Sequence, residues 1–344
     1  MIIFRVDGNQ NIGMGHVMRC LSIAKELRKL GRQCIFVLAD NRVQKYIEEE
    51  GFLCKVLNSD YQDLDSEVEL ICKLISNLRP SCLVIDSYYV TKEYLNKIRT
   101  NLRIVYIDDR AEFAYPVDVL INYNIFASEL DYLQLYQSEQ VELPQLFIGC
   151  EYVPLREEFR NIQPKMLSSD VRNVLVSTGG ADKEHIALEF IKYLLNNPSY
   201  LNQFTFHFII GAMNQDRTQI ERLASDQTNI ILHKNVTKMA ELMMSCDIAI
   251  SAAGSTLYEL CACGIPTITY VIADNQIPAE KEFVSRDLMI SVGDYRKQDC
   301  FFKNLYKAIA VLAEDKNLFS KIQDKMSLTS PNNGAYKIAL IVTS

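Results

Sequence analysis

The stretch that decides the fold is a glycine turn near the start of the chain, Ile12-Gly13-Met14-Gly15-His16-Val17-Met18-Arg19. A short apolar run at 2–6 precedes it, and apolar residues spaced by three and four follow over 17–30. This order predicts a buried strand that feeds a turn and then a helix. Because glycine lets the backbone turn sharply and approach a ligand closely, the turn is a candidate site. His16, which can exchange protons near neutral pH, is predicted to lie where open parallel sheets bind ligands.

Composition limits the classes of protein that fit the chain. Its 344 residues suggest two domains, and 49% hydrophobic residues are enough for large cores. The net charge of −7 weighs against nucleic acid as a partner. The apolar start is too short for a signal peptide, and no uncharged apolar run reaches transmembrane length. We therefore expect a cytoplasmic monomer without membrane insertion.

Ten cysteines raise the questions of disulfides and of metal binding. Reduced thiols are expected, because the chain is large and lacks secretory features. Cys261 and Cys263 form a C-x-C pair with no matching pair and no nearby histidine, which does not suit a zinc site. Asp63 and Asp65 form a D-x-D element in a polar segment, where a solvated charge cluster is expected. The sequence thus predicts no metal and no cofactor.

Short apolar runs alternate with amphipathic stretches along the chain, which predicts β–α–β–α order and an α/β fold. Buried parallel strands are predicted at 2–6, 35–39, 83–85, 104–107 and 119–121, with helices at 43–50, 68–78 and 93–98. After a polar segment at 160–170, a second series of strands is predicted at 174–176, 204–210, 230–232, 247–250 and 267–271.

These patterns predict two Rossmann-like, doubly wound domains with an interdomain cleft. The N-terminal domain, residues 1–160, carries His16, and the C-terminal domain spans residues 161–330. The polar segment between them is predicted to be a linker. Residues 331–344 are predicted to form a C-terminal helix that packs back on either domain.

The first turn allows two other interpretations. In a dinucleotide-binding G-x-G-x-x-G motif the third glycine would fall at Met18, whose side chain blocks the close helix–strand packing that glycine provides. Asp40 ends the second predicted strand, where a ribose-binding acid would lie, so a nicotinamide site stays open. The other interpretation is a tight turn in which His16 has no chemical task.

The second candidate site follows the first strand of the C-terminal domain. Gly179 and Gly180 precede a predicted helix, whose N-terminal amides favour an anion. The structural alternative is a glycine turn in which Asp182 caps the helix.

The third candidate site is richer in hydrogen-bond donors. Ala253, Gly254, Ser255 and Thr256 follow a buried strand and open a helix, which makes a phosphate cradle of N–H and O–H groups. Glu259 lies one turn later, where a carboxylate could accept both hydroxyls of a ribose. The alternative is a capping box, in which the Thr-x-x-Glu pattern only caps its own helix.

Polar side chains also follow three other predicted strands. Asp274, Asn275 and Gln276 suit sugar hydroxyls or amides, and the alternative for them is an Asx turn. Asp86-Ser87-Tyr88 and Asp108-Asp109-Arg110 end two strands of the N-terminal domain in the same way. Their shared placement indicates a ligand site, because open α/β sheets bind ligands at the carboxyl ends of their strands.

Taken together, these motifs resemble the PseG-type UDP-sugar hydrolases of pseudaminic acid biosynthesis. The resemblance starts at 5–7 and 13–21 and continues in order through 86–88, 107–109, 179–182, 235–239, 253–259 and 273–276. It implies a GT-B fold similar to that of the MurG glycosyltransferase. It also implies metal-independent hydrolysis of a UDP-linked diacetamido-trideoxy-altrose, so the partners are the UDP-sugar substrate and the UDP product.

The resemblance assigns roles to individual residues. His16 is the implied general base on water, and Tyr88 and Asn275 hold the sugar at the reaction centre. Residues near the uracil, the ribose, the diphosphate or the sugar are Asp7, Gly13, Gly15, Arg19, Gly179, Gly180, Asp182, Asn235, Val236, Met239, Ala253, Gly254, Ser255, Thr256, Glu259, Asp274 and Gln276.

The chain departs from the family pattern at a few places. Thr178 stands where an aromatic residue is expected, Tyr88 and Tyr89 both compete for the sugar, and the sugar-facing loop at 125–145 matches nothing specific. A GT-B glycosyltransferase that uses the same UDP site is therefore the main alternative. A nucleotide-sugar-binding subunit without catalysis is a further one, against which His16 argues.

Overall fold

The computed structural model describes residues 1–99, 102–165, 170–329 and 333–344, and it divides into two compact units. Unit 1 comprises 1–156 and 333–344, and unit 2 comprises 157–332. The chain thus enters unit 2 slightly before the boundary predicted at 160/161. The boundary predicted at 330/331 lies outside the described residues. The last helix, α14 (Gly334–Thr343), is part of unit 1 and packs on α1 (Gly15–Lys29).

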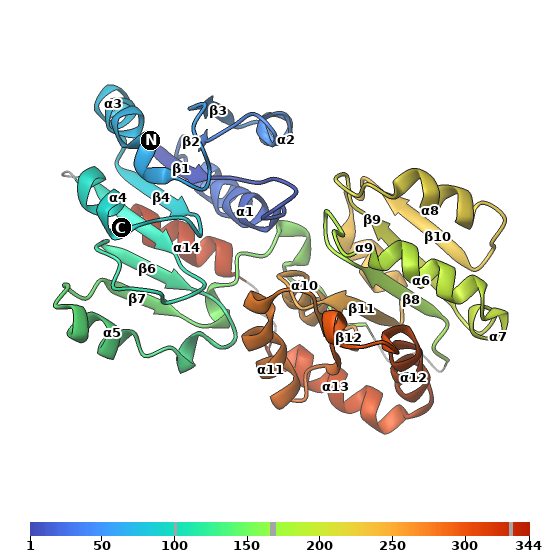
Figure 1. The fold of residues 1–344 in the computed structure, drawn as a ribbon. Coiled ribbons are helices and arrows are strands. Elements are labelled where there is room, and N and C mark those ends of the chain that lie inside the picture. Colours follow the sequence, from blue (N-terminus) through green and yellow to red (C-terminus); the bar gives the residue numbers. More distant parts are fainter. Residues whose placement is uncertain (100–101, 166–169, 330–332) are drawn as a thin grey trace. The chain divides into compact units, whose positions relative to one another are not determined.

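Unit 1 is built on a seven-stranded, all-parallel sheet with the order β3-β2-β1-β4-β5-β6-β7 (Figure 1). The strands are β1 (Ile2–Val6), β2 (Cys34–Leu38), β3 (Leu53–Val56), β4 (Cys82–Asp86), β5 (Arg103–Ile107), β6 (Val119–Asn122) and β7 (Gln145–Ile148). The chain runs from β1 outward to β3 and then returns to β4 on the other side of β1. The strand order therefore reverses between β1 and β4, which is where doubly wound sheets open a ligand site.

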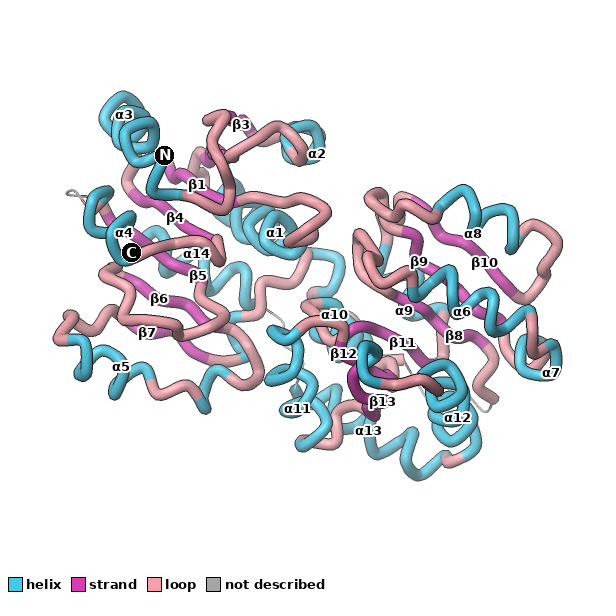
Figure 2. Tube along the Cα trace, in the orientation of Figure 1, coloured by secondary structure: helices cyan, strands magenta, loops and turns pink. Residues whose placement is uncertain are grey.

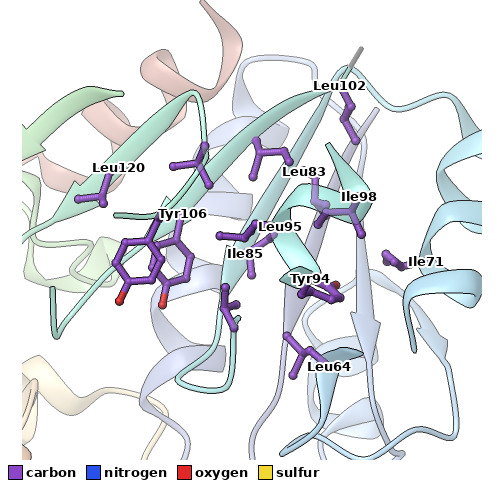
Figure 3. Close-up of a cluster of buried hydrophobic side chains, with 14 of the residues drawn as sticks. Leu64, Ile71, Leu83, Ile85, Tyr94, Leu95, Ile98, Leu102, Tyr106 and Leu120 are labelled. Carbon is purple, nitrogen blue, oxygen red and sulfur yellow. The ribbon is translucent and has the colours of Figure 1, made fainter. Parts of the chain in front are cut away.

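The helices of unit 1 connect most of its strands. Besides α1 and α14, they are α2 (Gln44–Glu49), α3 (Val68–Leu78), α4 (Lys92–Ile98) and α5 (Tyr132–Glu139). Figure 3 shows Tyr94, Leu95 and Ile98 of α4 beside Leu83 and Ile85 of β4, all of them buried. This packing removes large apolar side chains from water, at about 25 cal/mol for each Å² buried.

Unit 2 repeats the design with a six-stranded parallel sheet of order β10-β9-β8-β11-β12-β13. Its strands are β8 (Asn173–Ser177), β9 (Thr205–Ile210), β10 (Ile230–Lys234), β11 (Ile248–Ala252), β12 (Thr267–Val271) and β13 (Ile290–Asp294). Its helices are α6 (Ile186–Leu195), α7 (Pro198–Leu201), α8 (Arg217–Ala224), α9 (Met239–Ser245), α10 (Thr256–Cys263), α11 (Ile277–Ser285), α12 (Phe301–Glu314) and α13 (Lys316–Thr329). Figure 2 separates these strands and helices by colour. Here the order reverses between β8 and β11.

The predicted α/β class is confirmed, and the missed strands lie at sheet edges. β3, β7 and β13 each end a sheet, and their side chains are partly exposed rather than continuously apolar. The segment expected as a loop at 125–145 contains α5. In the predicted linker, Lys165 is anchored to Asp247 at 2.8 Å, and residues 166–169 lie outside the described residues.

All ten cysteines are free thiols. Within the described ranges, no helix is long and apolar enough to cross a lipid bilayer.

In unit 2, Gly180 and Gly211 lie so close together that Gly211 has no room for a side chain. A methyl group on Gly211 would lie 2.1 Å from the carbonyl oxygen of Gly180, so Gly211→Ala must push the two loops apart. We expect a loss of roughly 1–3 kcal/mol of unfolding free energy, as for overpacked cores. Urea unfolding followed by circular dichroism measures it. Gly180→Ala is the matched control, because its methyl group meets no atom within 4 Å. Equal stabilities of the two variants would contradict the contact.

Candidate functional site

The turn between β1 and α1 is held rigid by its own backbone. Asn9 and Gly13 pair as an isolated antiparallel bridge, and the Asn9 side-chain oxygen accepts hydrogen bonds from the amides of Asn11 and Ile12. Gly13 has a φ of +74°, which a residue with a side chain adopts only with strain. The turn therefore fixes where α1 begins, and with it the position of His16 in the first helical turn.

His16 is buried beside the end of β4. Its Nδ1 lies 2.5 Å from Oδ1 of Asp86, and its ring meets the ring of Tyr88 edge to face with centroids 4.4 Å apart. The other ring nitrogen, Nε2, forms no hydrogen bond to any residue in the described part of the chain. His16 thus has one nitrogen held by a carboxylate and one left for another molecule.

Arg19 lies one turn further along α1 and joins the ends of three strands into one network. It contacts both oxygens of Asp86 at 2.5 Å, and it forms a paired contact with Asp109 at 2.9 and 3.1 Å. It also donates to the hydroxyl of Tyr123 at 2.5 Å. Because these partners follow β4, β5 and β6, the network spans the sheet edge next to the reversal of strand order.

The charges in this network are set by burial and by Arg19. Burial alone would raise the pKa of Asp86, but Arg19 and His16 outweigh it and hold that pKa well below its usual range. Arg19 likewise outweighs burial at Asp109 and lowers its pKa. Burial raises the pKa of Tyr88 and of Tyr123. Near neutral pH the site therefore contains two ionised carboxylates and two neutral phenols.

The structure also distinguishes the two neighbouring tyrosines. Tyr88 contacts His16, and the guanidinium of Arg110 lies 4.4 Å from the centre of the Tyr88 ring. Tyr89 instead packs edge to face on Tyr61 with centroids 5.6 Å apart. Of the two, Tyr88 is the one placed beside the candidate base.

Asp7 belongs to a separate buried network under the end of β1. Its carboxylate accepts a hydrogen bond from the Ala39 amide at 2.7 Å and pairs with the guanidinium of Arg5. Arg5 also holds both oxygens of Glu67, at 2.5 and 2.8 Å. Asp7 thus ties β1 to the end of β2, and its predicted role in substrate binding stays a prediction.

In unit 2, the turn after β11 presents backbone donors. Gly254 and Ser255 are exposed, α10 begins at Thr256, and the amides of Ser255 and Thr256 make no hydrogen bond to another described residue. Ser255 occupies the N-cap position without a side-chain cap bond. Thr256 is therefore the first helical residue and not the cap that a Thr-x-x-Glu capping box requires. Ala253 is buried, and Glu259 is half-buried in the first turn.

The glycine pair after β8 adjoins this turn, because β8 and β11 are neighbours in the sheet. Gly179 has a φ of +88°. Asp182 is buried and accepts hydrogen bonds from the amides of Ile186 and Ala187, both at 3.0 Å. Asp182 is not the N-cap residue, which is His185, but its carboxylate accepts hydrogen bonds from the first two amides of α6. Its substrate role stays a prediction.

A cavity of about 620 Å³, open to the surface, is formed by the end of β10, the loop after it and the start of α9. It is lined by Leu232, His233, Lys234, Asn235, Val236, Thr237, Lys238, Glu241 and Leu242. Two of the predicted uracil neighbours, Asn235 and Val236, line this cavity. The third, Met239, begins α9 directly after the lining residue Lys238.

The polar motif after β12 forms a short 3₁₀ turn. Asn275 is exposed, whereas Gln276 accepts a hydrogen bond from the Ile272 amide at 2.9 Å and so braces the turn. Asp274 pairs with Arg296 at 2.7 Å. Arg296 follows β13, a strand that the sequence did not predict, so its place here could not be anticipated.

Asp86, Asp109 and Arg110 were noted in the sequence only as strand-end residues, with no role given to any of them. Tyr123 was missed, and no sequence signal singled it out. Within the described ranges, no group of three His, Cys, Asp or Glu side chains is placed to hold a metal ion.

The two doubly wound units define the class of the protein, which is the GT-B fold. A solved structure of MurG from Acinetobacter baumannii matches with a TM-score of 0.69, covers 99% of each chain and is 12% identical in sequence. Residues 173–333 match the glycosyltransferase family 28 C-terminal domain. The predicted fold is thus confirmed.

Sequence similarity to individual proteins indicates the family within the GT-B class. The chain is 31% identical to the uncharacterized protein MJ1062 of Methanocaldococcus jannaschii over 80% of its own length, and it spans 56% of that relative. It is 25% identical to the UDP-2,4-diacetamido-2,4,6-trideoxy-beta-L-altropyranose hydrolase of Campylobacter jejuni, over 75% of this chain and 86% of that protein. The resemblance to the PseG-type hydrolases is therefore confirmed.

Proposed function

We propose that the protein hydrolyses a UDP-linked diacetamido-trideoxy-hexose to free sugar and UDP, without a metal, in pseudaminic acid biosynthesis. The observation that carries the proposal is His16, a buried histidine with one nitrogen on Asp86 and the other without a described partner. The similarity to a named UDP-sugar hydrolase supports the substrate class. The same residues suit water activation, which a binding subunit does not need.

Unit 2 is the proposed nucleotide-binding part. The exposed amides at the start of α10 suit the diphosphate, because helix N-termini attract anions. The cavity that Asn235 and Val236 line suits a base. Glu259, in the first turn of α10, is the proposed ribose ligand.

In the proposed reaction, a water oxygen attacks the anomeric carbon and the bond from that carbon to the diphosphate oxygen breaks. His16 Nε2 takes the proton from water, and UDP leaves with the electron pair of the broken bond. Such general base catalysis contributes roughly 10²–10⁴ in rate. Backbone N–H groups at α10 stabilise the charge that develops on the departing diphosphate. Tyr88 and Asn275 hold the sugar.

The ribose assignment makes a prediction for Glu259. Glu259→Gln keeps the size of the side chain but removes its charge, so hydrogen bonds from the ribose hydroxyls weaken. We expect UDP to bind about tenfold more weakly, since hydrogen bonds to charged groups contribute about 1.5–3 kcal/mol. Calorimetric titration with UDP measures this. Glu314→Gln, which changes an exposed glutamate at the end of α12, away from the proposed nucleotide ligands, is the control. Equal UDP affinities for Glu259→Gln and the unmodified protein would remove Glu259 from the ribose site.

A panel of UDP-linked amino sugars, incubated with the protein and no acceptor, tests the function itself. Free sugar and UDP in equal amounts, followed by NMR, are expected for the diacetamido-trideoxy sugar. If UDP is bound but no sugar in the panel turns over, the protein is a binding subunit instead.

A glycosyltransferase is the second candidate. The match of 173–333 to a glycosyltransferase domain and the MurG-like fold favour it. In that case an acceptor hydroxyl replaces water, and sugar transfer needs the acceptor. Release of sugar without any acceptor separates the two candidates.

A further inference from the structure

We infer that Asp86 is a positioning residue that sets the tautomer of His16, and that Arg19 is the counter-charge of Asp86 rather than a ligand of the diphosphate. The inference rests on the proposed function, because it explains why His16 is a base in the hydrolysis. It reassigns Arg19, for which the sequence suggested substrate binding.

The partners of the imidazole ring decide which nitrogen carries its proton. An ionised carboxylate only accepts hydrogen bonds, so His16 Nδ1, which lies 2.5 Å from Asp86 Oδ1, must carry the ring proton. In the neutral ring Nε2 is then unprotonated and presents its lone pair. That is the form a general base needs. The edge-to-face contact with Tyr88 holds the ring plane, so the lone pair keeps one direction.

Arg19 uses all of its hydrogen-bond donors within the network. Its guanidinium has five N–H groups, and the network uses all of them. Nε and one Nη2 hydrogen go to Asp86, the second Nη2 hydrogen and one Nη1 hydrogen go to Asp109, and the last goes to Tyr123. No donor is left for a phosphate. Arg19 therefore keeps Asp86 ionised and in place.

Removal of Asp86 would change the partner of the imidazole ring. The remaining neighbour of His16 Nδ1 in the network is Nη2 of Arg19, at 3.0 Å, and it is a donor. Without Asp86, Arg19 donates to Nδ1, and the ring proton moves to Nε2. The nitrogen that faces no described partner then has no lone pair to offer water, although the histidine is still present.

Asp109 provides a matched control for this argument. It pairs with the same guanidinium through two hydrogen bonds, but it forms no hydrogen bond with His16. Asp86→Ala and Asp109→Ala thus each remove one carboxylate from Arg19. Only the first removes the partner of the imidazole.

The experiment measures both the tautomer and the turnover. In the protein labelled with ¹⁵N, long-range ¹H–¹⁵N spectra near neutral pH should show the His16 proton on Nδ1, with the His16 signal assigned by its loss in His16→Asn. In Asp86→Ala the proton should move to Nε2, and kcat should fall by about 10²–10⁴ with little change in KM. In Asp109→Ala the tautomer should persist and kcat should fall less than about tenfold.

Two results would overturn the inference. One is a proton on Nε2 in the unmodified protein, which needs no variant to fold. The other is an equal loss of kcat in the two alanine variants, which would indicate that Asp86 acts only by supporting Arg19. If the unmodified protein turns over no UDP-sugar, the proposed function fails while the tautomer measurement still reports on Asp86.

Discussion

His16→Asn is expected to abolish sugar release and to leave UDP binding intact. The variant removes the nitrogen that accepts the proton of water, and with it roughly 10²–10⁴ in rate. UDP binding should persist, because the proposed nucleotide ligands Asn235, Gly254 and Glu259 belong to unit 2, whereas His16 belongs to unit 1. Sugar release is measured by NMR, and UDP affinity by calorimetric titration.

His185→Asn is the control for that variant. His185 is exposed, pairs with Asp216, and has a φ of +56°, a conformation that asparagine tolerates better than most residues. This change should leave sugar release close to that of the unmodified protein. Full sugar release in His16→Asn would remove His16 from the mechanism.

Arg5→Met is expected to cost about 3–5 kcal/mol of unfolding free energy, because it leaves buried carboxylates without a cation. Arg5 is fully buried in the middle of the sheet, and it pairs with Asp7 and with both oxygens of Glu67. Since domains are stable by about 5–15 kcal/mol, the loss is large enough to threaten the folding of unit 1.

Chemical denaturation followed by circular dichroism measures this loss. Lys45→Met is the matched control, because it breaks an ion pair with Glu49 in which the lysine side chain is 89% exposed. Exposed pairs contribute about 0–1 kcal/mol. If Arg5→Met costs no more than Lys45→Met, the buried network does not stabilise the unit.

The central strands could be predicted from the sequence, but the edge strands could not. Strands such as β1 and β4 are buried on both faces, so they appear as largely apolar runs. In β3 the alternate side chains face water, and Leu53 is 73% exposed. A short strand that is half exposed has no apolar run to distinguish it from a loop, and β13, which contains Ser291, Gly293 and Asp294, is of this kind. β7 does carry three apolar residues, Leu146, Phe147 and Ile148, but it is only four residues long and only partly buried.

The candidate site also has a part that the sequence could predict and a part that it could not. His16 could be identified because its turn is local, with glycines and a helix next to it in the sequence. Its partner Asp86 is 70 residues away, and the Asp109 that shares Arg19 is 90 residues from that arginine. Only the strand order brings these groups together. The sequence indicated that polar residues end the strands, but the folded sheet decides which of them meet.

The role of Asp182 shows a second limit of sequence reasoning. A polar residue after a glycine pair suits both a ligand and a helix cap, and the sequence left both open. The structure shows the carboxylate on the Ile186 and Ala187 amides, the first two of α6, although His185 and not Asp182 is the N-cap residue. At α10 the structure instead excludes the capping box that the Thr-x-x-Glu pattern allowed, because Ser255 and not Thr256 is the N-cap residue.

Hydrolysis of the UDP-linked diacetamido-trideoxy-hexose in ¹⁸O-labelled water, with no acceptor present, tests the central claim most directly. Attack of water on the anomeric carbon predicts free sugar and UDP in equal amounts, no ¹⁸O in the UDP, and loss of the reaction in His16→Asn. Mass spectrometry of the UDP reads the label. Release of sugar only when an acceptor is added, or ¹⁸O in the diphosphate, would contradict attack of water on the anomeric carbon.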